Sequence, residues 1–202
     1  MKQVDGASWV LHPNHVNTDA YMEGAFTWDE CDEIIRLGKQ GGLKPAQIIG
    51  SDKEGQEEKD FSDIRKSKVY FMHPNENTAW IYRKLTGIVE NLNQQFFRFD
   101  LYNFGEAFQF TEYSAPGEHY TWHVDMAIDH TPRKLSIAIQ LTDPDEYEGG
   151  DFEIWHSSEP TKLNRQRGTV LVFPSYQLHR VTPVTKGTRN SLVAWVGGPC
   201  LK

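Results

Sequence analysis

The chain has 202 residues, a formal net charge of −7 and 12% aromatic residues. This length favours one domain with a sizeable core, and the aromatic content argues against a disordered chain. The acidic balance argues against nucleic acid as a partner, because binding a phosphate backbone requires basic patches. The apolar runs are much shorter than the ~20 residues of a membrane helix, so we expect no membrane contact. The oligomeric state stays open.

The N-terminus and the cysteines indicate the compartment. Residues 1–6 contain no apolar segment of the kind found in signal peptides. There are two cysteines, Cys31 and Cys200, which we interpret as unpaired thiols in a reducing compartment. We therefore expect a cytoplasmic protein.

The first half of the chain predicts helices and one strand, over 69–72. Thr27 is suited to cap a helix over 27–38, and Glu30 three positions later completes a capping box. Gly41 and Gly42 are expected to end it. Apolar residues at helical spacing predict a second, long helix over 75–97. Between them, residues 50–60 are charged and unpatterned, which indicates a surface loop or, alternatively, a lid over a site.

From residue 100 onward the pattern changes to short runs rich in β-branched and aromatic residues, separated by turn residues. The predicted strands lie at 101–102, 107–113, 134–141, 151–155, 168–173 and 191–196. We predict an α+β fold and a single domain over 1–202. Residues 1–99 would form a mainly helical support with an acidic loop at 50–60, and residues 100–199 a double-stranded β-helix, or jelly roll, that holds the catalytic site.

One tripeptide suggests a metal site within this second half. His123 and Asp125 are two positions apart, and side chains at this spacing point to the same face of a strand. A second imidazole would complete the two-histidine, one-carboxylate set of non-haem Fe(II) oxygenases. His179 is the best candidate, because it follows a strand-like run.

Other residues strengthen or compete with this interpretation. Arg189, ten positions after His179, could clamp a dicarboxylate through paired hydrogen bonds. Tyr113 lies ten positions before His123. His119 and His123 could instead form a zinc pair four residues apart on a helix, but the preceding Pro-Gly and the β-forming flanks argue against a helix there. The remaining histidines are interpreted as structural or exposed.

Taken together, these motifs resemble the Fe(II)/2-oxoglutarate-dependent dioxygenases of the prolyl 4-hydroxylase superfamily, in particular the PKHD-type hydroxylases of bacteria and phages. The resemblance covers roughly residues 100–199. It rests on YSAPG at 113–117, HVD at 123–125, LTDPDEYEGGDF at 141–152, FPSYQLHRVTPV at 173–184 and GTR at 187–189.

The resemblance implies roles for seven residues. The iron ligands would be His123, Asp125 and His179. Arg189 would bind the far carboxylate of 2-oxoglutarate and count among the catalytic residues, Tyr113 would donate to the same carboxylate, Val181 would line the cosubstrate pocket, and Trp195 would lie near the metal. Because Asp125 is present, the chain does not resemble the halogenases of this superfamily.

The resemblance also implies Fe(II), 2-oxoglutarate and O2, with ascorbate as an optional addition. The expected reaction is hydroxylation of a prolyl residue in a protein or peptide, with succinate and CO2 as coproducts. Two alternatives remain: a hydroxylase of a free amino acid or other small molecule, and a metal-binding jelly-roll module without catalysis.

Overall fold

The computed structural model describes residues 17–46, 62–126 and 132–199. Those residues form two α-helices, a π-helical turn, a short 3-10 turn and thirteen strands, which is the predicted α+β class. None of the helices in these ranges is long and apolar enough to cross a membrane. The strands are β1 Ala20–Met22, β2 Lys44–Pro45, β3 Arg65–Lys66, β4 Lys68–Met72, β5 Phe108–Ser114, β6 His119–His123, β7 Arg133–Gln140, β8 Tyr147–Gly149, β9 Phe152–Trp155, β10 Pro160–Lys162, β11 Val170–Pro174, β12 His179–Val181 and β13 Val184–Gly197.

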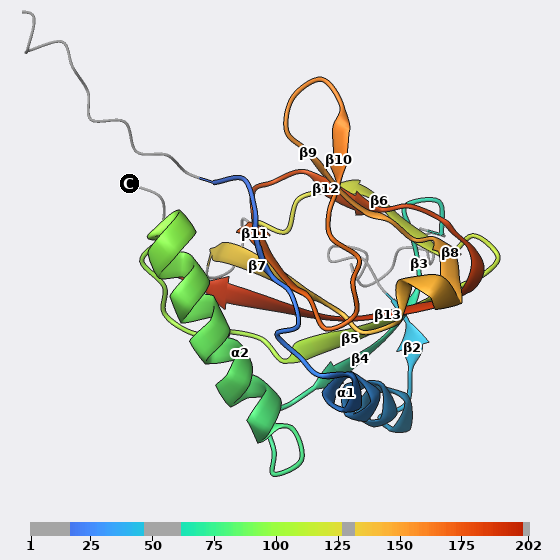
Figure 1. The fold of residues 1–202 in the computed structure, drawn as a ribbon, viewed down its shortest axis with the longest axis horizontal. Coiled ribbons are helices and arrows are strands. Elements are labelled where there is room, and N and C mark those ends of the chain that lie inside the picture. Colours follow the sequence, from blue (N-terminus) through green and yellow to red (C-terminus); the bar gives the residue numbers. More distant parts are fainter. Residues whose placement is uncertain (1–16, 47–61, 127–131, 200–202) are drawn as a thin grey trace, which may run out of the picture.

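The strands form two antiparallel sheets that face each other (Figure 1). The larger sheet runs β1-β11-β7-β13-β5-β4-β2, with β8 paired to the start of β13. The smaller sheet runs β10-β9-β12-β6-β3. Apart from the β9–β10 hairpin, most neighbours in the two sheets are far apart in sequence, as in the crossed connections of a jelly roll. The predicted double-stranded β-helix is therefore confirmed.

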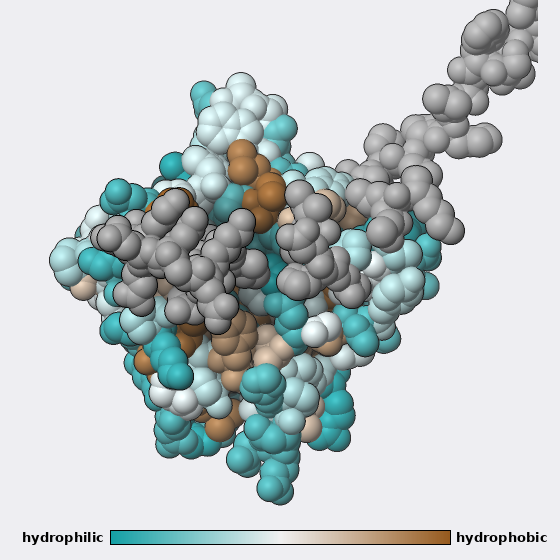
Figure 2. Space-filling model, turned by 180° about the vertical axis from the view of Figure 1, so that it is seen from behind, coloured by the Kyte–Doolittle hydropathy of each residue, from teal (hydrophilic) through white to brown (hydrophobic). Residues whose placement is uncertain are grey.

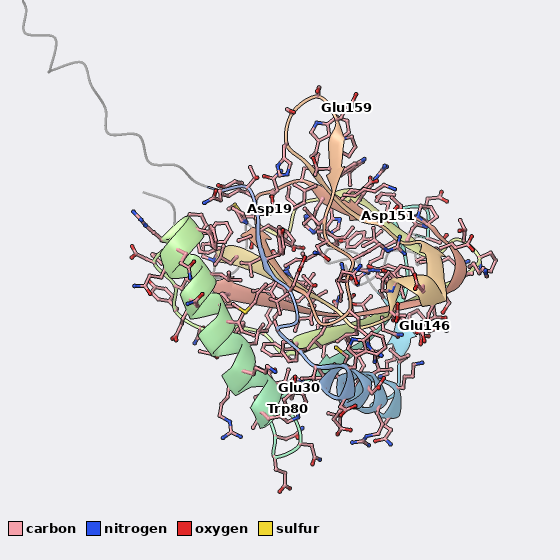
Figure 3. All side chains as sticks on the ribbon, viewed as in Figure 1. Asp19, Glu30, Trp80, Glu146, Asp151 and Glu159 are labelled. Carbon is pink, nitrogen blue, oxygen red and sulfur yellow. The ribbon has the colours of Figure 1, made fainter. Side chains whose placement is uncertain are left out.

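The helices pack on the outer face of the larger sheet (Figure 1). α1 (Trp28–Gln40) begins at Thr27 with the predicted capping box and ends at the C-cap residue Gly41. Gly38 lies so close to the ring of Phe110 in β5 that an added Cβ would be only 2.3 Å from it. α2 (Ala79–Leu92) meets α1 near Glu30, whose carboxylate accepts hydrogen bonds from Lys84 at 2.5 and 2.7 Å (Figure 3).

The second helix is shorter than the predicted 75–97. It starts at Ala79 because the Asn75 side chain accepts from the backbone N–H groups of Asn77 and Thr78 and forms a turn instead. Its last turn, Asn93–Phe97, is π-helical. The predicted strand at 101–102 is absent: this segment only leads to an isolated bridge at Phe104.

Strand alternation divides the interior into two cores. On β7, Leu135, Ile137 and Ile139 face the helices, where they join the main core. The intervening Ala138 packs between the two sheets in a second core with residues such as Phe152. β13 alternates in the same way, so its odd-numbered residues from 189 to 195 line the space between the sheets.

The first half of the chain does more than supply helices. It also supplies β1, which pairs with β11, and β4, which pairs with β5. Strands this short have no readable period, so the sequence did not reveal β1. The acidic segment 50–60 lies outside the described residues, as does Cys200. The division of the single domain near residue 100 stays a prediction.

Candidate metal centre

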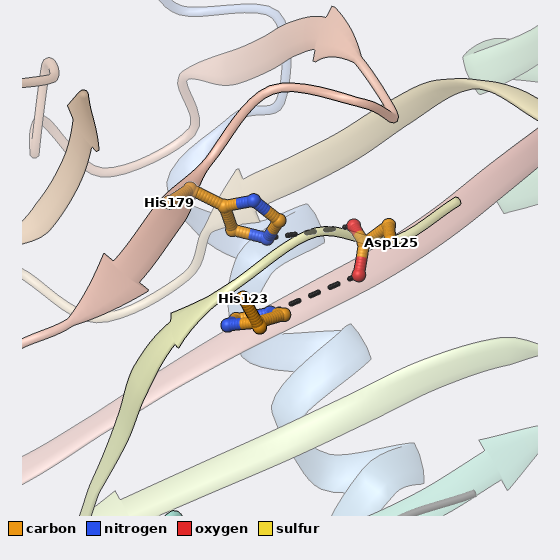
Figure 4. Close-up of side chains that lie close together, drawn as sticks. All are labelled: His123, Asp125 and His179. Carbon is orange, nitrogen blue, oxygen red and sulfur yellow. Dashed lines mark ion pairs between the residues drawn. The ribbon is translucent and has the colours of Figure 1, made fainter. Parts of the chain in front are cut away.

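The three predicted ligands converge between the two sheets (Figure 4). His123 ends β6, His179 begins β12, and the two residues are directly paired across these strands. Asp125 lies just beyond β6. Its carboxylate oxygens are 3.8 Å from Nε2 of His123 and 3.5 Å from Nε2 of His179. One ligand atom from each residue lies within 4.8 Å of the others, so a single ion could contact all three.

Both imidazoles are held in the orientation that metal binding requires. The Nδ1–H of His123 donates to the carbonyl of Thr121 at 2.8 Å, and that of His179 donates to the carbonyl of Gln177 at 2.9 Å. Each bond places the proton on Nδ1 and leaves the lone pair of Nε2 directed at the site. The donor set of two imidazoles and one carboxylate is the set that suits Fe(II).

The protonation states fit as well. Burial, followed by the nearby His179, lowers the pKa of His123 to about 4, so its imidazole is neutral at pH 7. Burial alone would raise the pKa of Asp125. The two histidines, with smaller contributions from the Ser136 hydroxyl and the Trp195 indole, outweigh this effect, and the net shift of that pKa is downward. Asp125 is therefore a carboxylate, and the neutral imidazole of His123 is free to bind a cation.

The ligands line a cavity of about 550 Å³ between the sheets. Its rim includes the exposed apolar residues Ile64, Phe71 and Val124. Seen from behind in Figure 2, hydrophobic side chains gather beside the hollowed centre of this face, below the projecting β9–β10 hairpin. A volume in this range suits a small ligand or one segment of a larger one.

Arg189 lies in the same cavity and carries a buried charge. Only 1% of its surface is exposed, and it forms no ion pair with any aspartate or glutamate of the described residues. Its Nε is buried without a hydrogen-bond partner. An uncompensated buried cation is costly, so this geometry calls for an anionic ligand. The Tyr113 ring centre is 5.6 Å from the Arg189 guanidinium carbon, because the two residues are paired between β5 and β13.

The cavity also contains Val181 and Trp195, so all seven residues singled out by the sequence lie together. Two further cavity residues were missed. Tyr120 stacks on the His123 ring, with 3.5 Å between centroids. Arg133 lies over the Trp195 ring and donates to the backbone carbonyl of Asp125 at 3.2 Å. Neither belongs to a recognisable motif. Strict strand alternation would place Tyr120 and His123 on opposite faces of β6, but a bulge in the pairing of β6 with β12 lets both side chains face the cavity.

The structure also describes two of the other residues that the sequence singled out, His119 and Cys31. His119 lies at the start of β6, which excludes the helical zinc pair, and its Nδ1 contacts the carbonyl of Gly117. Cys31 is a free, fully buried thiol, and burial raises its pKa to about 11. His12, His15 and His130 lie outside the described residues.

Comparison with known proteins identifies this arrangement. Residues 108–197 match the family model described as "2OG-Fe(II) oxygenase superfamily". This part of the chain is similar to that superfamily, and the match covers less than half of the 202 residues. The curated relatives are named PKHD-type hydroxylases, and the solved structures that share the fold include prolyl hydroxylases.

Two curated relatives are PKHD-type hydroxylases of cyanobacteria. The protein of Prochlorococcus marinus is 40% identical over 84 residues, and that of Synechococcus sp. (strain CC9605) is 44% identical over 85 residues. Each match covers 41% of this chain and 38% of the relative. The chain thus spans well under half the length of the curated relatives it matches, and their activity does not transfer on this ground alone.

Solved structures share the oxygenase fold at low sequence identity. A prolyl-4-hydroxylase of Pseudomonas putida is 19% identical with a TM-score of 0.69, covering 90% of this chain and 93% of its own. A prolyl hydroxylase from Trichoplax adhaerens, in complex with a hypoxia inducible factor peptide fragment, is 14% identical with a TM-score of 0.72, covering 90% and 84%. A viral collagen prolyl hydroxylase from Paramecium Bursaria Chlorella virus-1 in its 2OG complex is 22% identical with a TM-score of 0.66, covering 91% and 97%.

Proposed function

We propose that this chain is an Fe(II)- and 2-oxoglutarate-dependent oxygenase that hydroxylates a C–H bond of a prolyl residue in a polypeptide. One observation carries the proposal. The same cavity holds a three-residue metal set and, on the opposite sheet, a buried arginine that has no counter-ion among the described residues. A metal-binding module without catalysis would have no use for that arginine.

Different residues of the cavity would bind the metal and the cosubstrate. His123, Asp125 and His179 would hold Fe(II) and leave coordination positions open. Arg189 would pair with the far carboxylate of 2-oxoglutarate, assisted by the neighbouring Tyr113. When bound, the iron and 2-oxoglutarate would together activate O2, with succinate and CO2 released as one oxygen atom enters the substrate.

The remaining cavity residues would orient these groups. Tyr120 restrains the ring of His123 by stacking on it, and Arg133 restrains the backbone of Asp125. Arg133 is itself fixed by Glu106, which accepts two hydrogen bonds of 2.6 Å from its guanidinium. Val181 and Trp195 would form apolar walls that exclude water from the reacting centre.

The class of reaction is tested by loading the protein with Fe(II) under anaerobic conditions and adding 2-oxoglutarate. The chelate should produce a weak visible charge-transfer band, and admission of O2 should then yield succinate. The band should disappear in Asp125→Ala and persist in His119→Ala. Absence of the band in iron-loaded wild type would refute the proposal and favour the non-catalytic module.

The similarity of the fold to that of known prolyl hydroxylases supports a prolyl substrate. The structural neighbours include prolyl hydroxylases, one of them bound to a peptide. The exposed apolar rim of the cavity also suits a chain that extends beyond it. We expect incubation with proline-containing peptides, poly(L-proline) among them, to add one oxygen atom to a prolyl residue, as read by mass spectrometry.

A small molecule remains the second candidate because the cavity volume lies within the range of small-ligand sites. The decisive assay offers free amino acids and peptides to the same iron-loaded preparation and measures succinate formed per hydroxylated product. Coupled turnover with a free amino acid, without turnover of any peptide, would replace the prolyl proposal while leaving the oxygenase proposal intact.

A further inference from the structure

A residue that no motif points to lies behind the cavity wall, in contact with Arg189. Gln140, the last residue of β7, is 2% exposed and lies behind Arg189. Its Oε1 accepts a hydrogen bond of 2.9 Å from Nη2 of Arg189. It does not line the cavity itself, so it acts on any cosubstrate only through the arginine.

The orientation of the Gln140 amide is fixed at both ends. Its Nε2 donates to the backbone carbonyl of Asn164 at 3.2 Å, while its Oε1 faces the guanidinium. A flipped amide would place N–H groups against N–H groups and oxygen against oxygen, so only one orientation satisfies both partners. The backbone is equally constrained, because Gln140 exchanges hydrogen bonds with the 168–169 turn at 2.7 and 3.0 Å.

The partner of Arg189 at this position is therefore a neutral acceptor. The amide holds one guanidinium nitrogen in place without cancelling the positive charge. Ser191 contributes only a long contact of 3.5 Å to Nη1, and Nε has no hydrogen-bond partner in the part of the chain that the structure describes. A carboxylate in the same place would form a buried ion pair with Arg189 and neutralise it.

We propose that Gln140 is a positioning residue that aims Arg189 and preserves its charge for a dicarboxylate cosubstrate. The inference rests on the proposed function, because it assumes that the anion bound by Arg189 is 2-oxoglutarate. It predicts that the choice between an amide and a carboxylate at residue 140 decides cosubstrate affinity, although the residue never touches the cosubstrate.

The test is the nearly isosteric substitution Gln140→Glu, compared with Gln140→Met, which removes the hydrogen bond but adds no charge. Affinity for 2-oxoglutarate is measured by anaerobic calorimetry on the iron-loaded proteins, and stability by thermal unfolding of the metal-free proteins. In Gln140→Glu we expect 2-oxoglutarate to bind roughly 10- to 100-fold more weakly, the effect of losing a hydrogen bond to a charged group. Its unfolding temperature should stay near that of wild type, because the ion pair with Arg189 offsets the loss of the hydrogen bond to the Asn164 carbonyl.

Gln140→Met should show the opposite balance, with a lower unfolding temperature and a smaller loss of 2-oxoglutarate affinity. A purely structural glutamine would make affinity follow stability in both variants. Equal 2-oxoglutarate affinity in Gln140→Glu and wild type would overturn the role of Gln140 alone. Failure of iron-loaded wild type to bind 2-oxoglutarate would overturn both this inference and the proposed function.

Discussion

The two sheets contribute different chemistry and differ in burial. The smaller sheet supplies both imidazoles, and all five residues of β6 are only half-buried. The larger sheet supplies Arg189, Tyr113 and Trp195 from β5 and β13, where most residues are buried. Metal binding thus depends on the more accessible sheet, and anion binding depends on the core.

Asp125 connects the two. It follows β6 of the smaller sheet, yet its N–H donates to the carbonyl of Ser175, at the end of β11 in the larger sheet, at 2.9 Å. Arg133, the first residue of β7, donates to its carbonyl. Asp125 is therefore the candidate ligand whose backbone is held by the larger sheet, the sheet that also carries Arg189. Variants of each sheet should consequently lose different functions.

The largest effect is expected for Asp125→Ala. Substitutions of residues that merely orient metal ligands reduce metal affinity or activity by ~10- to 100-fold, so loss of a ligand should exceed ~100-fold in 2-oxoglutarate turnover. Iron content and succinate formation measure it. His119→Ala is the matched control on the same sheet and should retain both, and loss of iron in that control would mean that the ligand set is wrong.

Arg189→Met should separate the anion-binding function of the larger sheet from the metal-binding function of the smaller sheet. We expect 2-oxoglutarate affinity to fall by roughly 10- to 100-fold, as for other lost hydrogen bonds to charged groups, while iron content stays normal. Because the substitution removes a buried charge without a counter-ion, the metal-free protein should be at least as stable as wild type. Calorimetry and thermal unfolding check both. Arg189→Lys keeps the charge and should retain more affinity; a destabilised Arg189→Met would contradict the interpretation of Arg189 as unpaired.

The sequence could predict those site residues whose side chains have a distinctive chemistry. Two imidazoles, a carboxylate and an arginine at these spacings are rare together, so His123, Asp125, His179 and Arg189 were placed correctly in one cavity. Gln140 could not be predicted in this way, because a glutamine at the end of a strand is common. Only the pairing of β7 with β13 places it behind Arg189.

The elements of the fold likewise include some that local sequence patterns predict and some that they do not. The helix α1 could be predicted from its spacing, since one of its faces is buried. The strand β7 could be predicted from its run of β-forming residues, since both of its faces are buried. β1 is three residues long and pairs with β11 about 150 positions away, so its position depends on tertiary contacts that no local pattern encodes.

The third expected effect is a pH dependence that arises in the smaller sheet. The pKa of His123 is lowered to about 4 in the folded protein, against an ordinary value of 6.5. Between these values the unfolded chain binds a proton that the folded protein does not, so the free energy of unfolding of the metal-free protein should fall as the pH drops from 6.5 to 4. The loss should be about 1–3 kcal/mol. Denaturant titrations at several pH values measure it, and His123→Asn should show a shallower slope; an equally steep slope there would assign the effect to other groups.

The smallest effect is expected behind the larger sheet, at the cap of α1. Thr27 accepts a hydrogen bond from the N–H of Glu30 at 3.2 Å, and Glu30 accepts one from the N–H of Thr27 at 2.7 Å. Thr27→Ala should lower the free energy of unfolding by about 1 kcal/mol, because the N–H of Glu30 loses its acceptor. Thr27→Ser keeps the hydroxyl and should restore most of the loss. Iron and 2-oxoglutarate binding should be unchanged in both variants, since α1 supports only the outer face of the sheet; a change in either affinity would show that the helix is coupled to the cavity through β5.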